Sequence, residues 1–477
     1  MHRSYILFLS ITALVSSACS NNGIAPNATA PNTPSNGTGG NGDGTSTGVG
    51  DPNLLDAGRH RHDLGLVHDL STGGGAPDLA TGGGGTGGGG GTGGGGGTGG
   101  GGGTGPSSPF IDTANAIHAF LTFDYRLAVT QIPQIASRTD FVWGSGWPAE
   151  WHAANPKTYV SFYLTWNQDT TGQPLSWWKA NHPDWVLYQC DQQTPALVSG
   201  YPQMILDISN PAVQAWQLAQ VKTAAAKGYD GIGFDLYALD NHRSACGIFR
   251  NGQWVQLYNG TRSDAKYTAD ALSWLKNMYT AMHALPKPMG VIPNYALDRA
   301  ASDPLIAQVI ANVDAVLDEY ATGNDGSYVT DSSWLQRMQF VTNLQRAGKA
   351  YFALSGFSTL DTNAIQWALA SYLMTKENHA ALYVAQVSGG TYGSDAWRNE
   401  YSAAVGAACG AMSQSGSVYV RPFARGLAVV NPSSSKSAQY ALPAGTYTDL
   451  YGKAVSGSVT LAPHSGIVLL VAGAPRC

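Results

Sequence analysis

Two apolar segments of the sequence open on an aspartate and close on a carboxylate at the same offset. The first runs from Asp230 to Asp235 and the second from Asp314 to Glu319. In a barrel of parallel strands, a carboxylate at the C-terminal end of a strand points toward the mouth, where active sites lie. Two such carboxylates from different strands can supply the acid and the nucleophile, or the base, that split a glycosidic bond. The spacing therefore predicts a two-carboxylate site made of Asp235 and Glu319.

The second segment ends in two adjacent acids, so the choice between Asp318 and Glu319 needs a further argument. Side chains alternate between the two faces of a strand. If the two segments form equivalent strands, Glu319 matches Asp235, and Asp318 faces the other way. We expect Glu319 to belong to the site, with Asp318 as the alternative. Asp230 and Asp314 begin their strands and are expected to stabilise the opposite end of the barrel.

Strand-like and helix-like segments alternate along the chain, which is typical of a parallel sheet with helical crossovers. Eight segments have strand character, the number that closes a (β/α)8 barrel. They are residues 117–124, 140–144, 158–165, 230–235, 288–294, 313–319, 350–355 and 380–387. The predicted fold class is therefore α/β, a (β/α)8 TIM barrel. A doubly wound open sheet is the alternative, but no glycine-rich dinucleotide-binding turn follows an early strand.

Helix signals and a change of pattern near the C-terminus define the rest of the folded part. Asn210, Asp331 and Asp361 each precede a helix-like stretch and are expected to cap it. The barrel is predicted over residues 110–412. Short strands separated by Gly, Pro and Ser turns then predict a small antiparallel β domain over residues 413–477.

The N-terminal part of the chain has a different composition. Residues 1–19 combine a short basic start, an apolar core and small residues before Cys19, which is typical of a lipoprotein-type signal peptide. An apolar core this short does not span a bilayer. Residues 20–109 are rich in Gly, Thr and Ser and are predicted to be a disordered linker. We expect an exported lipoprotein, held at the outer membrane or cell surface by a lipid on Cys19, with a secreted protein as the alternative.

Charge and cysteine content limit the partners. The net charge is −5, and no long basic run indicates a nucleic-acid partner. If Cys19 carries a lipid, four cysteines remain, which permits two disulfides in an exported protein. The preferred pairs are Cys190 with Cys246 and Cys409 with Cys477. The folded part has no zinc-binding motif, so no metal or cofactor is expected, and we expect a monomer.

Other polar and aromatic residues lie where the predicted strands end or in the loops that follow. Such positions contact substrate in barrel enzymes, and aromatic rings stack on the apolar faces of sugars. The candidates for substrate binding are Asp124, Tyr125, Trp143, Trp166, Asp207, Tyr237, Asn294 and Tyr320. For the aspartates, capping or salt-bridging a loop is the alternative. For the tryptophans in the long segment 166–210, the alternative is that they cover the core.

Several stretches of the sequence together resemble a known group of exported bacterial barrel proteins. They are HPDWVLYQCD (182–191), LDISNP (206–211), GYDGIGFDLY (228–237) and VDAVLDEY (313–320), with VYVRPF, GLAVVNP and SGIVLLV toward the C-terminus. Over residues 115–471 the chain resembles the hypothetical glycoside hydrolase family 15-like group. It is also distantly similar to the α-galactosidase clan.

The resemblance to the clan implies an aspartate nucleophile after the fourth strand and an acid/base carboxylate after the sixth. Asp235 and Glu319 lie on those strands. The clan also implies an α-linked substrate and retention of configuration. The sixth-strand acid of the clan is an aspartate, whereas this chain has Asp318 beside Glu319, so both remain candidates.

The sequence thus predicts an exported glycoside hydrolase that cleaves an α-linked poly- or oligosaccharide with two carboxylates. The alternative from a different class is a non-catalytic carbohydrate-binding or adhesin-like surface lipoprotein, which would use the same aromatic cleft without a carboxylate pair. A structural surface protein whose glycine repeat is the functional part is a third possibility.

Overall fold

The computed structural model describes residues 117–197, 203–295, 297–324, 327–377, 379–387, 393–473 and 477. The predicted signal peptide (1–19), the linker (20–109) and Cys19 lie outside the described residues. Within the described ranges, no helix has both the length and the apolar character that crossing a membrane requires.

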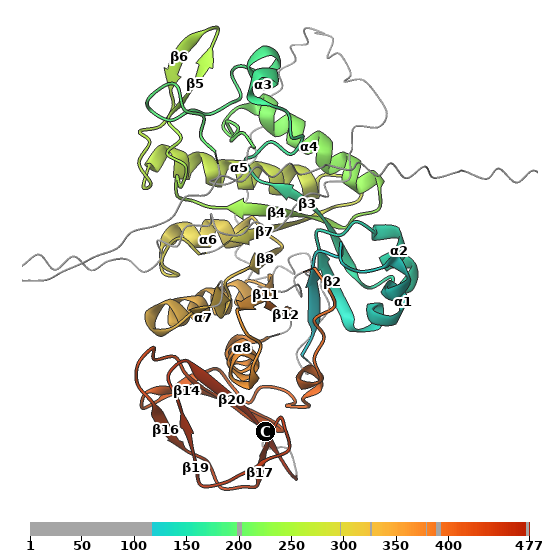
Figure 1. Cartoon of the computed structure of the whole chain (residues 1–477), viewed down its shortest axis with the longest axis vertical. Helices are drawn as coiled ribbons and strands as arrows, with labels where there is room; N and C mark the ends of the chain where they lie inside the picture. The colour runs from blue at the N-terminus through green and yellow to red at the C-terminus, as the bar shows by residue number, and fades with distance from the viewer. Residues whose placement is uncertain are drawn as a thin grey trace, which may run out of the picture. The chain divides into compact units, whose positions relative to one another are not determined.

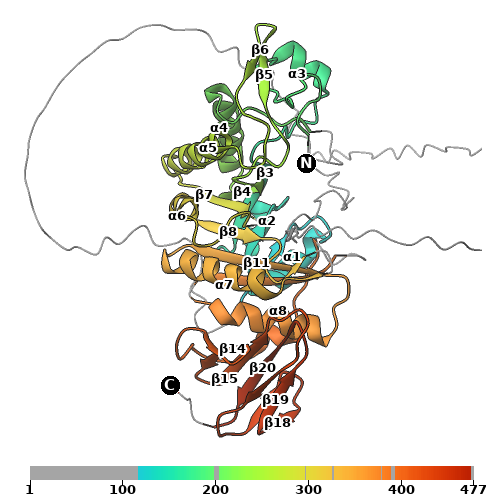
Figure 2. The ribbon, with the colours of Figure 1, turned by 90° about the vertical axis from the view of Figure 1, so that its left-hand side faces the viewer.

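Eight parallel strands close into a barrel, as predicted (Figures 1 and 2). They are β1 (Ala119–Thr122), β2 (Thr139–Trp143), β3 (Tyr159–Thr165), β4 (Gly231–Tyr237), β7 (Gly290–Tyr295), β8 (Ala315–Asp318), β11 (Ala350–Phe357) and β12 (Ala380–Gln386). Their order around the barrel is β1-β12-β11-β8-β7-β4-β3-β2. Each predicted strand segment overlaps one of these strands, and closure of the sheet rules out the doubly wound alternative. In this order β7 lies between β4 and β8, the strands of the two predicted carboxylates.

Helices pack on the outside of the barrel, with α5 against β7, α7 against β11 and α8 against β11 and β12 (Figure 2). The helices are α1 (Ile132–Ile135), α2 (Pro148–Ala154), α3 (Leu175–Asn181), α4 (Pro211–Ala226), α5 (Ala265–His283), α6 (Pro304–Ala311), α7 (Asp331–Arg346) and α8 (Thr362–Thr375). Asn210 and Asp361 cap α4 and α8 as predicted. The predicted cap at Asp331 is wrong, because α7 is preceded by Thr330 and Asp331 instead accepts a bond from Ser434 N.

Two glycines of β4 make room for large side chains inside the barrel, and they show which face of the strand carries Asp235. A Cβ atom at Gly231 would lie 2.8 Å from the Tyr159 hydroxyl oxygen, and one at Gly233 would lie 2.5 Å from Trp143 Nε1. The large rings therefore fill the barrel interior only because these positions have no side chain. Alternate residues of a strand share a face, so Asp235 is the next inward position, at the C-terminal end.

The N-terminal end of the barrel holds Asp230 and Asp314, as expected for residues that begin strands. Asp230 lies 2.8 Å from His152 Nε2 and 2.8 Å from Lys287 Nζ. Asp314 lies 2.9 Å from His283 Nε2. Each aspartate therefore ties a strand to neighbouring helices or loops, far along the strand from the C-terminal mouth.

The long segment after β3 builds a small core of its own. It contributes α3 and packs against the hairpin of β5 (Gly247–Arg250) and β6 (Gln253–Gln256). Trp178 and Trp185 are buried in this core, whereas Trp177 is only partly buried against it. A disulfide between Cys190 and Cys246 joins the segment to the hairpin. At least two of the tryptophans in segment 166–210 thus lie in the interior of an inserted subdomain.

A second antiparallel region follows the barrel. Its strands are β13 (Ser413–Ser415), β14 (Val418–Phe423), β15 (Gly426–Asn431), β16 (Ala438–Ala441), β17 (Tyr447–Asp449), β18 (Ala454–Val455), β19 (Ser458–Leu461) and β20 (Ser465–Val471). Six of them form one sheet, and β16 pairs with β19. A two-stranded pair of β9 (Gly323–Asn324) and β10 (Ser327–Tyr328) lies earlier in the chain. The Cys409–Cys477 disulfide closes the region.

Helix α8 joins the barrel to this sheet. Its described side chains from Ala364 to Thr375 are all buried, because one side faces β11 and β12 and the other faces β15 and β20. A helix that is buried all round needs no polar stripe, which explains its apolar sequence. Arg421 of β14 is 2% exposed and donates to Leu373 O and Lys376 O, so it satisfies carbonyls at the C-terminus of α8.

Candidate active site

A single amide brings the two predicted carboxylates together at the C-terminal mouth. Asn294 Nδ2, near the end of β7, donates to Asp235 Oδ1 at 2.9 Å and to Glu319 Oε2 at 2.7 Å. Because both bonds end on one nitrogen, the two oxygens are separated by no more than these two lengths end to end. Retaining glycosidases place their carboxyl groups roughly 5–5.5 Å apart and inverting ones roughly 6.5–9.5 Å. The limit for this one pair of oxygens lies below the inverting range of the carboxyl groups, which favours the retaining arrangement.

Asp235 is fixed by its own backbone as well as by its neighbours. It accepts bonds from Leu236 N at 2.9 Å and from the Tyr163 hydroxyl at 2.8 Å. Leu236 has a φ of 60°, in the left-handed region that non-glycine residues rarely adopt. Such strain persists where the surrounding structure enforces it, often at functional sites. Phe123, at the end of β1, has a similar φ of 61°.

Burial and hydrogen bonding shift the pKa of Asp235 in opposite directions. Burial raises the pKa of its carboxyl group above the usual value, while the bonds from Asn294, Tyr163 and Leu236 N lower it. Both Asp235 and Glu319 remain half-buried rather than fully enclosed. The arrangement can therefore hold one carboxylate ionised within reach of a second carboxyl group.

Asp318 lies on the opposite face of its strand from Glu319, as the alternation of side chains predicts. It is fully buried, accepts bonds from the Tyr351 hydroxyl and Tyr320 N at 3.1 Å, and lies 3.7 Å from Arg337 Nε of α7. Burial raises the pKa of Asp318, and Arg337 opposes that rise. These contacts are with Tyr351 of β11, Tyr320 N and Arg337 of α7, whereas Asn294 binds Asp235 and Glu319.

Three of the predicted substrate-binding rings are core residues. Trp143, Trp166 and Tyr237 are each at most 2% exposed. Trp143 donates from Nε1 to Ile292 O inside the barrel. Trp166 and Tyr237 pack edge to face, 5.1 Å apart, behind the strands. For Trp166 the structure favours the alternative that it covers the core, and Trp143 and Tyr237 are core residues too.

The two predicted substrate-binding aspartates hold loops. Asp124 is 2% exposed and accepts bonds from Gly146 N and Trp151 Nε1, both at 2.9 Å. Asp207 is 1% exposed and accepts from Ser209 N at 3.0 Å and from the Ser209 hydroxyl at 2.6 Å. Burial raises the pKa of both carboxyl groups. Their neighbours are structural, so the capping alternative describes them better than contact with substrate.

Tyr125 and Tyr320 are the remaining candidates with accessible surface. Tyr125 is 37% exposed and packs near Phe123, with ring centroids 5.8 Å apart. Tyr320 is half-buried and follows Glu319 directly. Tyr163 is a site residue that the sequence prediction omits. Strand alternation could have found it, since it lies one inward position before the end of β3, beside the strand that carries Asp235.

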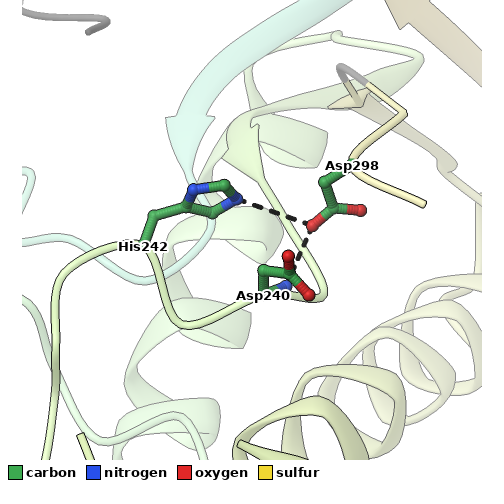
Figure 3. A group of neighbouring side chains, drawn as sticks. All are labelled: Asp240, His242 and Asp298. Atoms are coloured by element: carbon green, nitrogen blue, oxygen red, sulfur yellow. Dashed lines mark hydrogen bonds and ion pairs between the residues drawn. The ribbon is translucent and has the colours of Figure 1, made fainter. Parts of the chain in front are cut away.

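A group of two aspartates and a histidine lies on the loops after β4 and β7 (Figure 3). Asp298 accepts bonds from Leu239 N and Asp240 N, and lies 3.6 Å from His242 Nε2. Burial raises the pKa of Asp298, but the bonds from His242, the Tyr295 hydroxyl and Asp240 N outweigh it, and the pKa is lowered. Asp240 also pairs with Arg299 Nη2 at 2.8 Å. Since both carboxylates already bind donors, the group serves to pin the two loops together rather than to present free metal ligands.

A cavity of about 890 Å³ lies away from the carboxylates, beside the C-terminal halves of α7 and α8. Met338, Arg346, Met374 and Arg421 are among the residues that line it. None of the predicted catalytic or substrate-binding residues lines it. We therefore place the candidate site by the carboxylate geometry and not by cavity size.

The comparison with solved structures finds several α-glucan enzymes. The α-glucosyl transfer enzyme XgtA has a TM-score of 0.44 and 11% identity, with 75% of this chain and 99% of that chain covered. The type III pullulan hydrolase from Thermococcus kodakarensis has a TM-score of 0.41 and 12% identity, covering 76% of this chain and 77% of that chain. An α-amylase from Lactobacillus plantarum has a TM-score of 0.43 and 13% identity, covering 75% and 99%.

The comparison of sequences gives a family but no curated relative. No curated protein matches the sequence. The family model described as "Hypothetical glycosyl hydrolase family 15" matches residues 152–427, which include β3 to β12, Asp235, Asn294 and Glu319. Since this match spans more than half of the sequence, the chain belongs to the hypothetical glycosyl hydrolase family 15 and is a glycoside hydrolase.

Proposed function

We propose that the protein is an exported glycoside hydrolase that cleaves an α-linked poly- or oligosaccharide with retention of configuration. Asp235 is the nucleophile and Glu319 the acid/base. The observation that supports this most strongly is the amide of Asn294, which binds both carboxylates and limits their separation. The α linkage rests on the resemblance to the α-galactosidase clan.

In the first step, Asp235 attacks the anomeric carbon while protonated Glu319 donates its proton to the departing glycosidic oxygen. The bond from the anomeric carbon to the leaving oxygen breaks, and an ester between the sugar and Asp235 forms. In the second step, Glu319 removes a proton from water, which attacks the same carbon and releases Asp235. Two inversions at one carbon give overall retention, and no redox partner is needed.

Export and the lipid anchor on Cys19 are part of the same proposal. Two disulfides, Cys190–Cys246 and Cys409–Cys477, are in keeping with an oxidising compartment outside the cytoplasm. The non-catalytic binding alternative is weaker. It needs an accessible aromatic cleft, whereas Trp143, Trp166 and Tyr237 are buried.

A panel of α-linked polysaccharides, with detection of released reducing ends, tests the proposed activity. The wild-type protein should release product from at least one of them, and the anomer formed first should match that of the bond cleaved. A matched preparation of Asp235→Asn shows whether any activity is a contaminant. If wild type and Asp235→Asn release product equally after further purification has removed any contaminant, Asp235 is not the nucleophile.

A further inference from the structure

The side-chain amide of Asn294 donates both of its hydrogens to carboxylates of the protein itself. It is 6% exposed, and both donated bonds leave from Nδ2. An amide nitrogen has two hydrogens, so one reaches Asp235 and the other Glu319. In the reverse orientation the amide oxygen would face the two carboxyl groups, and an ionised Asp235 could only accept, so its bond from Asn294 would be lost. This arrangement leaves Asn294 no free donor for a sugar hydroxyl, in contrast with its predicted role in substrate binding.

The hydroxyl of Tyr163 has a single hydrogen to donate. It donates to Asp235 Oδ2 at 2.8 Å, while Asn294 and Leu236 N use Oδ1. The Tyr163 ring is held by Trp143 and Phe123, each with its ring centroid 5.4 Å away. A ring fixed on two sides keeps its hydroxyl aimed at one oxygen.

We propose that Asn294 and Tyr163 are positioning residues with different tasks: Asn294 fixes the geometry of both carboxylates, and Tyr163 selects Asp235 as the one that stays ionised. This rests on the proposed function, in which one carboxyl group must hold a proton and the other must not. A donor shared by both groups favours the ionised form of each and does not choose between them. A donor whose single hydrogen goes to Asp235 favours the ionised form of that carboxyl group.

The electrostatic surroundings of Asp235 make this choice necessary. Tyr163 from β3 donates to it, and Glu319, which directly follows β8, shares with it the amide of Asn294 from β7. Two neighbouring carboxyl groups in a partly dry site cannot both ionise easily, and one keeps a proton. Without Tyr163, Asp235 loses one of the donors that favour its ionised form and keeps the bond from Leu236 N, so the proton is shared less unequally.

Three single substitutions separate these tasks through the pH dependence of kcat/KM. In Tyr163→Phe the acidic limb, which reports ionisation of Asp235, should move to higher pH while the alkaline limb stays. In Asn294→Ala both limbs should move to higher pH, because both carboxylates lose a donor. Turnover of Asn294→Ala should fall about tenfold to a hundredfold, the size expected for a lost bond to a charged group. Asn167→Ala is the control.

Asn167 is a suitable control because it is a similarly buried asparagine that does not touch either carboxylate. It is 5% exposed, and its Nδ2 donates to the Tyr267 hydroxyl at 3.2 Å. Asn167→Ala should lower the unfolding temperature and leave both limbs in place. If it moves the limbs as Asn294→Ala does, the effect of Asn294 is merely structural and the proposal is wrong.

A measurement that needs no activity separates this proposal from the proposed function. Carboxyl resonances of ¹³C-labelled Asp and Glu in the full chain are titrated, with Asp235→Asn and Glu319→Gln giving the assignments. The midpoint of Asp235 should rise in both Tyr163→Phe and Asn294→Ala, and that of Glu319 only in Asn294→Ala. Unchanged midpoints overturn the roles of both residues even if the enzyme is active. Shifted midpoints without activity on any glycan support the positioning roles and reject the proposed function.

Discussion

Asp235 and Glu319 carry the proposed chemistry, and each can be replaced by a near-isosteric neutral residue. Asp235→Asn and Glu319→Gln should each lower turnover by about 10³-fold, since general acid–base help alone contributes ~10²–10⁴-fold. Both side chains are half-buried at the mouth, so folding should be intact, which circular dichroism checks. Azide should restore part of the turnover of Asp235→Asn, and an activated leaving group part of that of Glu319→Gln.

The burial of Asp318 predicts how the stability of the folded protein depends on pH. Burial raises the pKa of Asp318 in the folded protein. The stability that the protonated carboxyl group contributes is therefore fully present below the pKa of the unfolded chain. It is lost as the pH rises toward the pKa of the folded protein. Asparagine cannot ionise. The unfolding temperature of wild type minus that of Asp318→Asn should therefore be largest near pH 4, close to the unfolded pKa of an aspartate, and shrink toward neutrality.

Thermal unfolding of both proteins over this pH range measures the difference, with the substitution Asp361→Asn at the cap of α8 as a control for general loss of an aspartate. A difference that grows with pH would mean that the ion pair with Arg337 dominates. Turnover gives a second check. If Asp318→Asn abolishes activity while Glu319→Gln keeps it, the assignment of faces is inverted.

Strand alternation explains which site residues the sequence can and cannot predict. It places Asp235 and Glu319 on one face and Asp318 on the other, because this depends only on position along a strand. The burial of Trp143 and Trp166 depends on what packs against them, which the sequence does not show. The two hydrogen bonds of Asn294 also could not be predicted from the sequence, because they follow from the order of strands in the barrel, in which β7 lies between β4 and β8.

At the scale of elements, apolar runs and caps predict strands and helices well where local signals agree with packing. All eight barrel strands follow from short apolar runs between turns. The hairpin β5–β6 is not predicted, because its strands are short, partly exposed and lie inside a long loop. The sequence predicts a helix cap at Asp331, but its side chain instead accepts a tertiary hydrogen bond from Ser434 N.

Arg421 tests the contact between α8 and the C-terminal sheet. Arg421→Met keeps much of the side-chain volume but leaves Leu373 O and Lys376 O without their donor. Unsatisfied buried carbonyls cost about 1–3 kcal/mol each, so the free energy of unfolding should fall by about 3 kcal/mol. Urea unfolding measures this fall. Arg425→Met, at an exposed position nearby, should change it by less than about 0.5 kcal/mol. Equal losses in both variants would contradict the role of Arg421.

For the whole molecule, the N-terminal part is expected to attach the enzyme and not to shape it. A protein lacking residues 1–109 should fold and turn over substrate like the full chain, because a linker of this composition has no core to contribute. Cys19→Ser should move the full-length protein from the membrane fraction to the soluble fraction with unchanged turnover. A variant that stays in the membrane fraction would show that Cys19 is not the anchor.

The central claim is that Asp235 becomes covalently bonded to the sugar, and trapping that intermediate tests it most directly. In a 2-deoxy-2-fluoro glycosyl fluoride of the sugar that the enzyme cleaves, the ring fluorine slows both steps and the fluoride leaving group speeds only the first, so the covalent intermediate should accumulate. The intact mass should rise by one fluorosugar, and peptide mapping should place it on Asp235. An adduct on Glu319 or Asp318, or first products of inverted configuration without any adduct, would contradict the claim.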